Sequence, residues 1–512
     1  MTTGNQRFSV DVQPEVFFSD STISDAVRSA VRNEKARRLG PRLYTRNMHE
    51  APEAVTRRNW APIAAGYFPG SVMTGRTAME FAPAADGSVF LIAPTTREVR
   101  TPGLRLRPRH GPGPAEGDTS WMGHPIFMSS RPRAFLENLV PSRARGGATS
   151  RTLRPEELET ALDEYGRLDP ASFNRLRDEA RALAPALGME AQSVALDRLI
   201  GTLLGTRDSP LSSWSARARA KGMPFDPARI ERFEALAGCL LGTALPALKT
   251  NRSHDLSVFA FFEAYFSNYI EGTEFTVAEA ERIVFRGEIP QQRPADAHDI
   301  LGTYRLLADD TERRRVPASA DELVGILRRQ HQAMLSARLD IGPGQWKQRP
   351  NQVGGRLFVA PELVEGTLRE SHRIYGSLPA GFARAAFAMF LVSEVHPFTD
   401  GNGRMARILM NSELTAADEQ RIIVRTSDRG DYLAALRGLT NTGNVVAYTA
   451  VLADLQRSSV AGDYSSLAAA EEDLKGRGAF HDVYDAGVDL GRVAPYGPSS
   501  AAGTTAMPSG RR

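Results

Sequence analysis

Cysteine is almost missing from this chain of 512 residues. Cys239 is the only one, which excludes internal disulfides and any metal site built from several cysteines. It lies in the apolar stretch 235–241, so we expect it to pack in a core. No apolar run approaches the roughly 20 residues that span a bilayer, and residues 1–10 are too polar for a secretory signal. These absences favour a cytoplasmic protein without membrane contact.

A strong surplus of one charge sign is also missing, because the net charge is only +3. The composition, 42% hydrophobic and 24% charged, is that of a soluble globular protein, and the length predicts about three domains. The charge is unevenly spread: residues 1–150 hold 20 Lys and Arg against 13 Asp and Glu. A basic amino-terminal part suits a nucleic-acid contact, although charged surfaces without a partner are commoner.

What is present is a dense group of functional residues in the stretch 395–407. The apolar run before it predicts a buried helix that His396 closes, and a second helix is expected to begin near Gly403 or Arg404. The amides at the start of that second helix would face the connecting bend. Gly401 and Gly403, on either side of Asn402, allow successive N–H groups to turn inward around a phosphate. The pattern therefore predicts an anion site.

Ionisable side chains surround this expected site. Asp400 suits Mg²⁺, which prefers one or two carboxylates together with phosphate oxygens and water. Arg404 and Arg407 share one face of the second helix and could hold the outer phosphates of a nucleotide. His396 is the group that titrates nearest neutral pH, and it could take a proton from an incoming hydroxyl.

These residues match, position for position, the motif His-x-Phe-x-(Asp/Glu)-Gly-Asn-Gly-Arg-x-x-Arg, and the chain therefore resembles the Fic family. Members of this family usually transfer AMP from MgATP to a Ser, Thr or Tyr hydroxyl of a target protein. The resemblance implies these roles: His396 as general base, Phe398 as buried anchor, Asp400 as magnesium ligand, Gly401, Asn402 and Gly403 as phosphate nest, Arg404 and Arg407 as contacts to the leaving pyrophosphate. A glycine-rich helix connection with an incidental histidine is the alternative.

A second motif precedes the first. Residues 267–272 match the family's inhibitory pattern (Ser/Thr)-x-x-x-Glu-(Gly/Asn), with Ser267, Glu271 and Gly272 at the defined positions. The resemblance implies that Glu271 pairs with Arg407 and so keeps that guanidinium from the γ-phosphate. Six residues alone would fit a helix-terminal glutamate before a glycine cap. Beside an intact Fic motif, auto-inhibition is our hypothesis.

Two further groups of residues are expected around the site. Residues 349–359 read as a hairpin that bends at Gly354 and Gly355. The resemblance makes it a flap that binds the target by adding a strand, through Asn351, Gln352, Val353 and Gly354. A surface hairpin without a ligand is the alternative. The resemblance also places Tyr432 and Asn441 near the adenine, with 440–444 as a loop that closes the pocket.

The amino-terminal region suggests a different activity. Residues 24–39 predict a basic helix, and residues 42–45 a short strand, which is the order of recognition helix and wing in a winged helix. The first 140 residues weakly resemble AbiEi-like antitoxin and regulator domains. DNA contacts, mainly to phosphates, would come from Arg28, Arg32, Lys35, Arg38 and Arg42. A protein-interaction or purely structural module is the alternative, because little precedes the expected recognition helix.

We therefore expect a multidomain, mainly α protein whose all-α Fic core carries a β-hairpin flap. The expected parts are a basic α/β, winged-helix-like domain (1–140), a linker (141–151), a helical connector (152–225), the Fic domain with its inhibitory helix (226–457) and a flexible tail (458–512). The sequence leaves the oligomeric state and the target protein open.

Three other functions compete with auto-inhibited AMP transfer. The same site could work in reverse and remove AMP from a modified target, with Glu271 orienting a water. It could use another donor, such as a UTP-derived nucleotide or a phosphocholine donor, although Gly403 and Arg404 favour a mononucleotide. The chain could also be a DNA-binding regulator whose Fic core only senses nucleotide.

Overall fold

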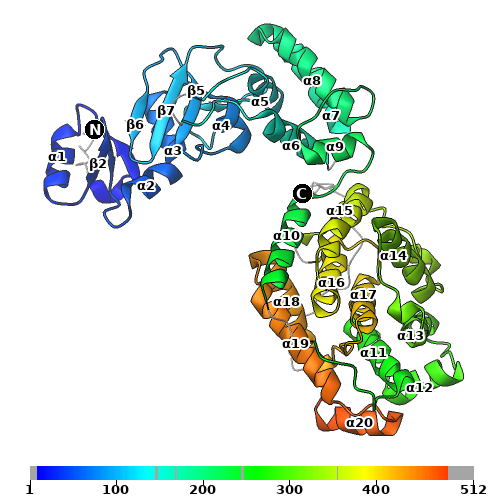
Figure 1. Ribbon diagram of the computed structural model, residues 1–512. Helices are drawn as coiled ribbons and strands as arrows, with labels where there is room; N and C mark the ends of the chain where they lie inside the picture. The colour runs from blue at the N-terminus through cyan, green and yellow to red at the C-terminus, as the bar shows by residue number, and fades with distance from the viewer. Residues whose placement is uncertain are drawn as a thin grey trace, which may run out of the picture. The chain divides into compact units, whose positions relative to one another are not determined.

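The computed structural model describes residues 9–481 except 145–147, 168, 170, 244–246 and 354–355. The chain divides into two compact units between Gly222 and Met223. The described residues are mainly helical (Figure 1). Among them, the two larger sheets lie in the first unit, and the second unit carries one short hairpin. Among the described residues, none of the helices combines the length and the apolarity that crossing a bilayer requires.

The first unit begins with a three-stranded antiparallel sheet in the order β1-β3-β2. Its elements are β1 (Val16–Phe18), α1 (Ser24–Arg32), β2 (Arg37–Gly40) and β3 (Leu43–Thr45). Val27 and Ala30 of α1 pack with Phe17 of β1 in a small core. The expectation of a helix through residue 39 is wrong, because Glu34 adopts a left-handed φ of 54° that ends it. Lys35 and Arg38 therefore lie beyond the helix, Arg38 on β2.

A mixed six-stranded sheet follows, in the order β6-β7-β5-β4-β9-β8. All five residues of the central strand β5 are buried, because the sheet is covered on both faces. Its strands are β4 (Val72–Met73), β5 (Ser88–Ile92), β6 (Val99–Thr101), β7 (Leu104–Arg109), β8 (Thr119–Ser120) and β9 (Phe127–Met128). The helices that accompany it are α2 (Pro52–Arg58), α3 (Trp60–Tyr67), α4 (Gly75–Glu80) and α5 (Arg131–Asn138).

Four helices complete the first unit: α6 (Pro155–Tyr165), α7 (Ala171–Leu187), α8 (Glu190–Leu203) and α9 (Trp214–Ala220). All four lie within residues 152–225, where a helical connector is expected. The Ser213 hydroxyl caps the last of them, and its Ala216 is fully buried.

The second unit is a bundle built around the antiparallel helices α16 and α17 (Figure 1). Its helices are α10 (Pro227–Gly242), α11 (Leu256–Ile270), α12 (Val277–Arg286), α13 (Pro294–Ala308), α14 (Ala320–Met334), α15 (Val364–Gly376), α16 (Phe382–Val395), α17 (Asn402–Ala416), α18 (Arg429–Thr442), α19 (Val445–Ala461) and α20 (Leu467–Gly476). Strands β10 (Gln352–Val353) and β11 (Arg356–Leu357) form its hairpin.

Three expectations for this unit are wrong. Cys239 is exposed on α10, because the side of that helix that packs on the bundle carries Phe233, Leu236 and Leu240 instead. The expected loop 440–444 is helical as far as Thr442. The expected flexible tail is ordered at its start, since α19 extends to residue 461 and α20 follows, while residues 482–512 lie outside the described part.

The ordering of α20 has a simple cause. Ala470 and Leu474 bury one face of the helix, and Phe480 behind it packs its ring against Tyr265 and Phe266 of α11. These few aromatic and aliphatic residues bury apolar surface that holds the segment in place, and the helix itself consists mostly of the strong helix formers Leu, Ala, Glu and Lys.

Candidate active site

The stretch 395–407 forms the end of α16, a tight bend and the first turn of α17. His396 closes α16 in a left-handed conformation with φ 52°, and its N–H donates to the carbonyl of Val392 at 2.9 Å. Phe398 is fully buried: its ring stacks on His331 with centroids 3.7 Å apart and lies 5.1 Å from Trp346. Phe398 thus fixes the bend, as expected.

Carbonyl groups of the bend point toward its supporting segments. The Asp400 carbonyl is 3.0 Å from Nε2 of His331, and the Pro397 carbonyl accepts the N–H of Lys347 at 2.9 Å. The Phe398 carbonyl accepts the side-chain amides of Asn351 at 3.0 Å and Asn402 at 2.9 Å. These bonds fix the backbone of the bend, so that the unpaired amides at the start of α17 remain for an anion.

His396 is held as a neutral base. Its ring stacks on Phe358 with centroids 3.9 Å apart, and one ring nitrogen is bonded to the backbone of Ser393. Burial, followed by the nearby Lys347, lowers the pKa of His396 to about 3. The imidazole is therefore unprotonated near pH 7, which is the form that can accept a proton.

Asp400 lies at the edge of the bend with its side chain 43% exposed. One carboxylate oxygen accepts the N–H of Gly401 at 2.7 Å, and the other lies 3.7 Å from Arg404 and 3.8 Å from Arg338. A half-exposed carboxylate beside an anion site fits Mg²⁺, which would complete its shell with phosphate and water.

The two motif arginines are buried and held by different partners. Arg404 donates to Asp299 of α13 at 2.8 Å and to Asn268 of α11 at 3.1 Å. Burial raises the pKa of Asp299, although the arginine opposes this. Arg407 donates to the Ser267 hydroxyl at 2.9 Å, and Glu271 accepts from it at 2.6 Å. Helix α11 thus contacts both arginines.

Glu271 also covers the start of α17. A Cβ atom built on Gly403 would lie 2.1 Å from the Glu271 carboxylate and 3.2 Å from Arg407, so only glycine permits this approach. The carboxylate therefore occupies the positively polarised first turn of the helix, where a phosphate would bind. Gly272, at φ 89°, turns the chain away directly after Glu271.

Tyr432 joins the site and Asn441 does not. The buried Tyr432 hydroxyl lies 3.5 Å from Arg407, and burial raises its pKa. Asn441 is exposed in the last turn of α18, so its expected place in a pocket-closing loop is corrected. The neighbouring Thr440 points inward instead and donates to Glu394.

The hairpin is present, with Gln352 paired to Leu357 and Val353 to Arg356. Gly354, expected in its bend, lies outside the described residues. Asn351 was expected to face a target, but it is buried and bonded to the bend, because the carbonyl of Phe398 needs a donor.

Several supporting residues were missed in the sequence: His331, Lys347, Asp299, Phe358 and Glu394. Four of them lie 38 or more residues before His396, and Glu394 lies inside an apolar run; each is a single polar or aromatic residue without a pattern. Only the fold brings those four to the bend.

Comparison with known proteins bears on this site. Residues 321–414, from α14 to the end of the motif helix, match the Fic/DOC family. The chain contains a Fic domain. Protein adenylyltransferase Fic of Nematostella vectensis is 25% identical over 238 residues, which cover 44% of this chain and 54% of the relative. The same-named protein of Drosophila melanogaster is 26% identical over 205 residues, 38% of this chain and 40% of the relative.

This chain thus spans about half the length of the first of these curated relatives and less than half of the second. Among solved structures, Fic-1 from C. elegans is similar at a TM-score of 0.33 and 19% identity, over 64% of this chain and 95% of that one. IbpAFic2 covalently tethered to Cdc42 is similar at a TM-score of 0.28 and 14% identity, over 62% of this chain and 99% of that one.

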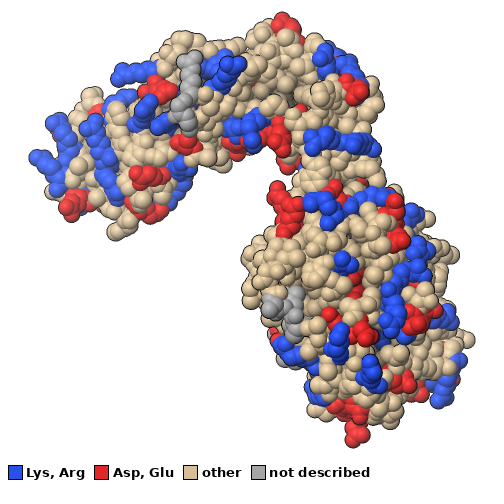
Figure 2. Space-filling model, in the orientation of Figure 1, with Lys and Arg blue, Asp and Glu red and all other residues tan. Residues whose placement is uncertain are grey.

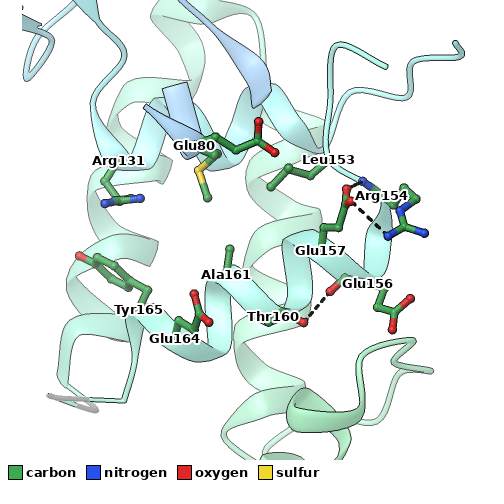
Figure 3. Close-up of a pocket in the computed structure, with 11 residues that line it drawn as sticks. Glu80, Arg131, Leu153, Arg154, Glu156, Glu157, Thr160, Ala161, Glu164 and Tyr165 are labelled. Atoms are coloured by element: carbon green, nitrogen blue, oxygen red, sulfur yellow. Dashed lines mark hydrogen bonds and ion pairs between the residues drawn. The ribbon is translucent and has the colours of Figure 1, made fainter. Parts of the chain in front are cut away.

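A separate hollow of about 660 Å³ lies in the first unit, between α4, α5 and α6 (Figure 3). Of the carboxylates in its lining, Glu80 and Glu157 are paired with Arg76, and Glu157 also with Arg154. This hollow contains none of the motif residues. We assign the chemistry to the Fic domain.

Proposed function

We propose that the protein is an auto-inhibited adenylyltransferase that transfers AMP from MgATP to a Ser, Thr or Tyr hydroxyl of a target protein. The observation that supports it most is the contact of Glu271 with Arg407 across Gly403, at the first turn of α17. A carboxylate there competes directly with a phosphate for the same amides and the same guanidinium.

The proposed reaction needs Glu271 to leave. The amides of residues 402 and 403, joined by that of Gly401 once its bond to Asp400 opens, would then bind the α- and β-phosphates, and Arg404 and Arg407 the outer ones. Asp400 would hold Mg²⁺, which neutralises phosphate charge when bound. Asp299 and Asn268 keep the Arg404 guanidinium in place for this task.

The transfer itself is an in-line displacement at the α-phosphorus. The target hydroxyl oxygen forms a bond to this phosphorus while the bond to the bridging oxygen of the β-phosphate breaks, and pyrophosphate leaves. The hydroxyl proton passes to the ring nitrogen of His396 that is not bonded to Ser393.

The test is AMP incorporation from α-labelled ATP by four forms of the full chain. Glu271→Gly should raise self-modification and target modification about tenfold or more, because a partly buried hydrogen bond between charged groups is worth roughly 1.5 kcal/mol or more. Glu271→Gly combined with His396→Ala should be inactive. Glu274→Gly, which removes an exposed carboxylate three residues away, should behave like wild type.

An unchanged incorporation by Glu271→Gly would remove the case for inhibition. Incubation of wild type with a pre-modified target distinguishes the reverse activity: release of AMP by wild type but not by Glu271→Gly would favour hydrolysis. Mass spectrometry of a lysate treated with the variant and heavy-labelled ATP, compared with other labelled donors, would identify the target and the donor.

We further propose that the first unit contacts DNA through α1 and the β2–β3 hairpin. All five expected contact residues, Arg28, Arg32, Lys35, Arg38 and Arg42, have exposed side chains. Figure 2 shows Lys and Arg gathered over this part of the unit. The sheet order β1-β3-β2 with a helix before the hairpin also suits a helix-and-wing arrangement.

Gel-shift titration with duplex DNA tests this second proposal. Arg28→Glu with Arg32→Glu should weaken binding by about tenfold or more at low salt, and binding by wild type should fall steeply as salt rises. Arg181→Glu, an exposed substitution on α7, is the matched control. Equal binding by all forms, or none by wild type, would contradict a DNA contact at this surface.

A further inference from the structure

Lys347 is a buried basic residue that the proposed reaction does not use. Its side chain lies between the base of the hairpin and the catalytic bend, and the residue is only 2% exposed. Among the described residues, no carboxylate lies within ion-pairing distance of it. Burying an ammonium group without such a partner is unfavourable. A lysine at this buried position therefore indicates a function for its side chain.

The contacts of Lys347 lie on both sides of His396. Its ammonium group donates to the carbonyl of Val395 at 3.4 Å, the residue before the histidine. Its backbone N–H donates to the carbonyl of Pro397 at 2.9 Å, the residue after it. One residue thus binds the carbonyl groups of both chain neighbours of the proposed general base.

His396 needs such support because of its backbone. A left-handed φ of 52° is uncommon for a residue with a Cβ atom, and it persists only where the surroundings fix it. A relaxed His396 would move its ring away from the face of Phe358 and from the bend. The bonds from Lys347 oppose this relaxation.

A second link connects Lys347 to the hairpin. Its ammonium donates to the side-chain oxygen of Asn351 at 2.7 Å, and the amide of Asn351 in turn donates to the Phe398 carbonyl at 3.0 Å. Asn351 directly precedes β10, so the same network joins the start of the hairpin to the bend.

We propose that Lys347 is a positioning residue that holds His396 in its left-handed conformation and joins the hairpin to the catalytic bend. This inference rests on the proposed AMP transfer. Its charge has a supporting effect, since Lys347 contributes to the lowered pKa of His396. Arg356 also faces His396, and Arg229 and Glu362 face Lys347, whose own pKa burial lowers to about 7.

The kinetic test uses the Glu271→Gly background. Lys347→Met should lower kcat about tenfold and leave the KM for ATP within about twofold, because the amides of α17 that bind phosphate are not among its partners. Lys347→Arg, which keeps charge and donors, should restore most of kcat. Arg329→Met removes an exposed charge from α14, outside the site and the hairpin, and should change neither value.

A second measurement does not depend on AMP transfer. The ¹³Cα chemical shift of His396, in otherwise wild-type protein with labelled histidine, reports its backbone conformation. The shift should move in Lys347→Met and stay unchanged in Lys347→Arg and Arg329→Met. An inactive Glu271→Gly parent would defeat the proposed function and leave this measurement to decide the role of Lys347.

An unchanged kcat or an unchanged His396 shift in Lys347→Met would overturn the proposal. An equal loss of kcat in Lys347→Met and Lys347→Arg would also overturn it. Such a result would show that the site rejects any change in side-chain shape, and not that it needs a hydrogen-bond donor.

Discussion

At the scale of residues, the site works by placing charged groups where water cannot compete. Arg404 and Arg407 are buried, yet each has partners for its guanidinium, and Glu271 is the partner that a nucleotide would have to displace. His396 is kept neutral by burial and by a nearby positive charge. The contacts of Glu271 that stabilise this arrangement are therefore the ones that must break for the proposed reaction.

The pH dependence of kcat follows from this environment. The ordinary pKa of histidine is about 6.5, and His396 is lowered to about 3. A base with a lowered pKa stays unprotonated until the pH falls toward that value. Below about pH 7, where Lys347 is charged, kcat of Glu271→Gly should therefore stay flat down to about pH 5. Initial rates of AMP incorporation at saturating ATP check this. A decline with a midpoint near 6.5 would show instead that the imidazole titrates like a solvated one.

At the scale of elements, the motif was readable because its residues are contiguous. Helices α16 and α17, the bend between them and the end of α11 all lie where the sequence predicts them. The supporting residues were not predictable, because His331, Lys347 and Asp299 reach the bend from three different segments. Long-range contacts of single residues leave no period or spacing in the sequence.

The errors at this scale have local causes. Helix α1 stops early because one residue takes a left-handed conformation that the residue sequence did not reveal. Helix α20 forms where composition predicted a flexible tail, because its own residues are mostly the strong helix formers Leu, Ala, Glu and Lys, and Phe480 behind it packs on α11. Asn351 faces inward because a buried carbonyl requires a donor, a need that only the folded bend creates.

At the scale of the whole molecule, two compact units carry different surfaces. The Fic domain of the second unit holds the charged groups of the proposed reaction inside a helical bundle. The first unit exposes basic side chains on a small sheet and its helix. An enzyme site needs enclosed, preorganised groups, and a phosphate-backbone contact needs exposed ones, so the two proposals belong to separate parts of the chain.

The central claim is that the bend binds the phosphates of a nucleotide once Glu271 no longer covers Gly403. A crystal structure of the Glu271→Gly variant with magnesium and a non-hydrolysable ATP analogue tests it most directly. We expect the α- and β-phosphates on the amides of residues 401–403, Arg407 turned to the γ-phosphate, and His396 open to the side from which a hydroxyl would attack. A bend without phosphate, with the analogue bound elsewhere or His396 sealed from solvent, would contradict the account.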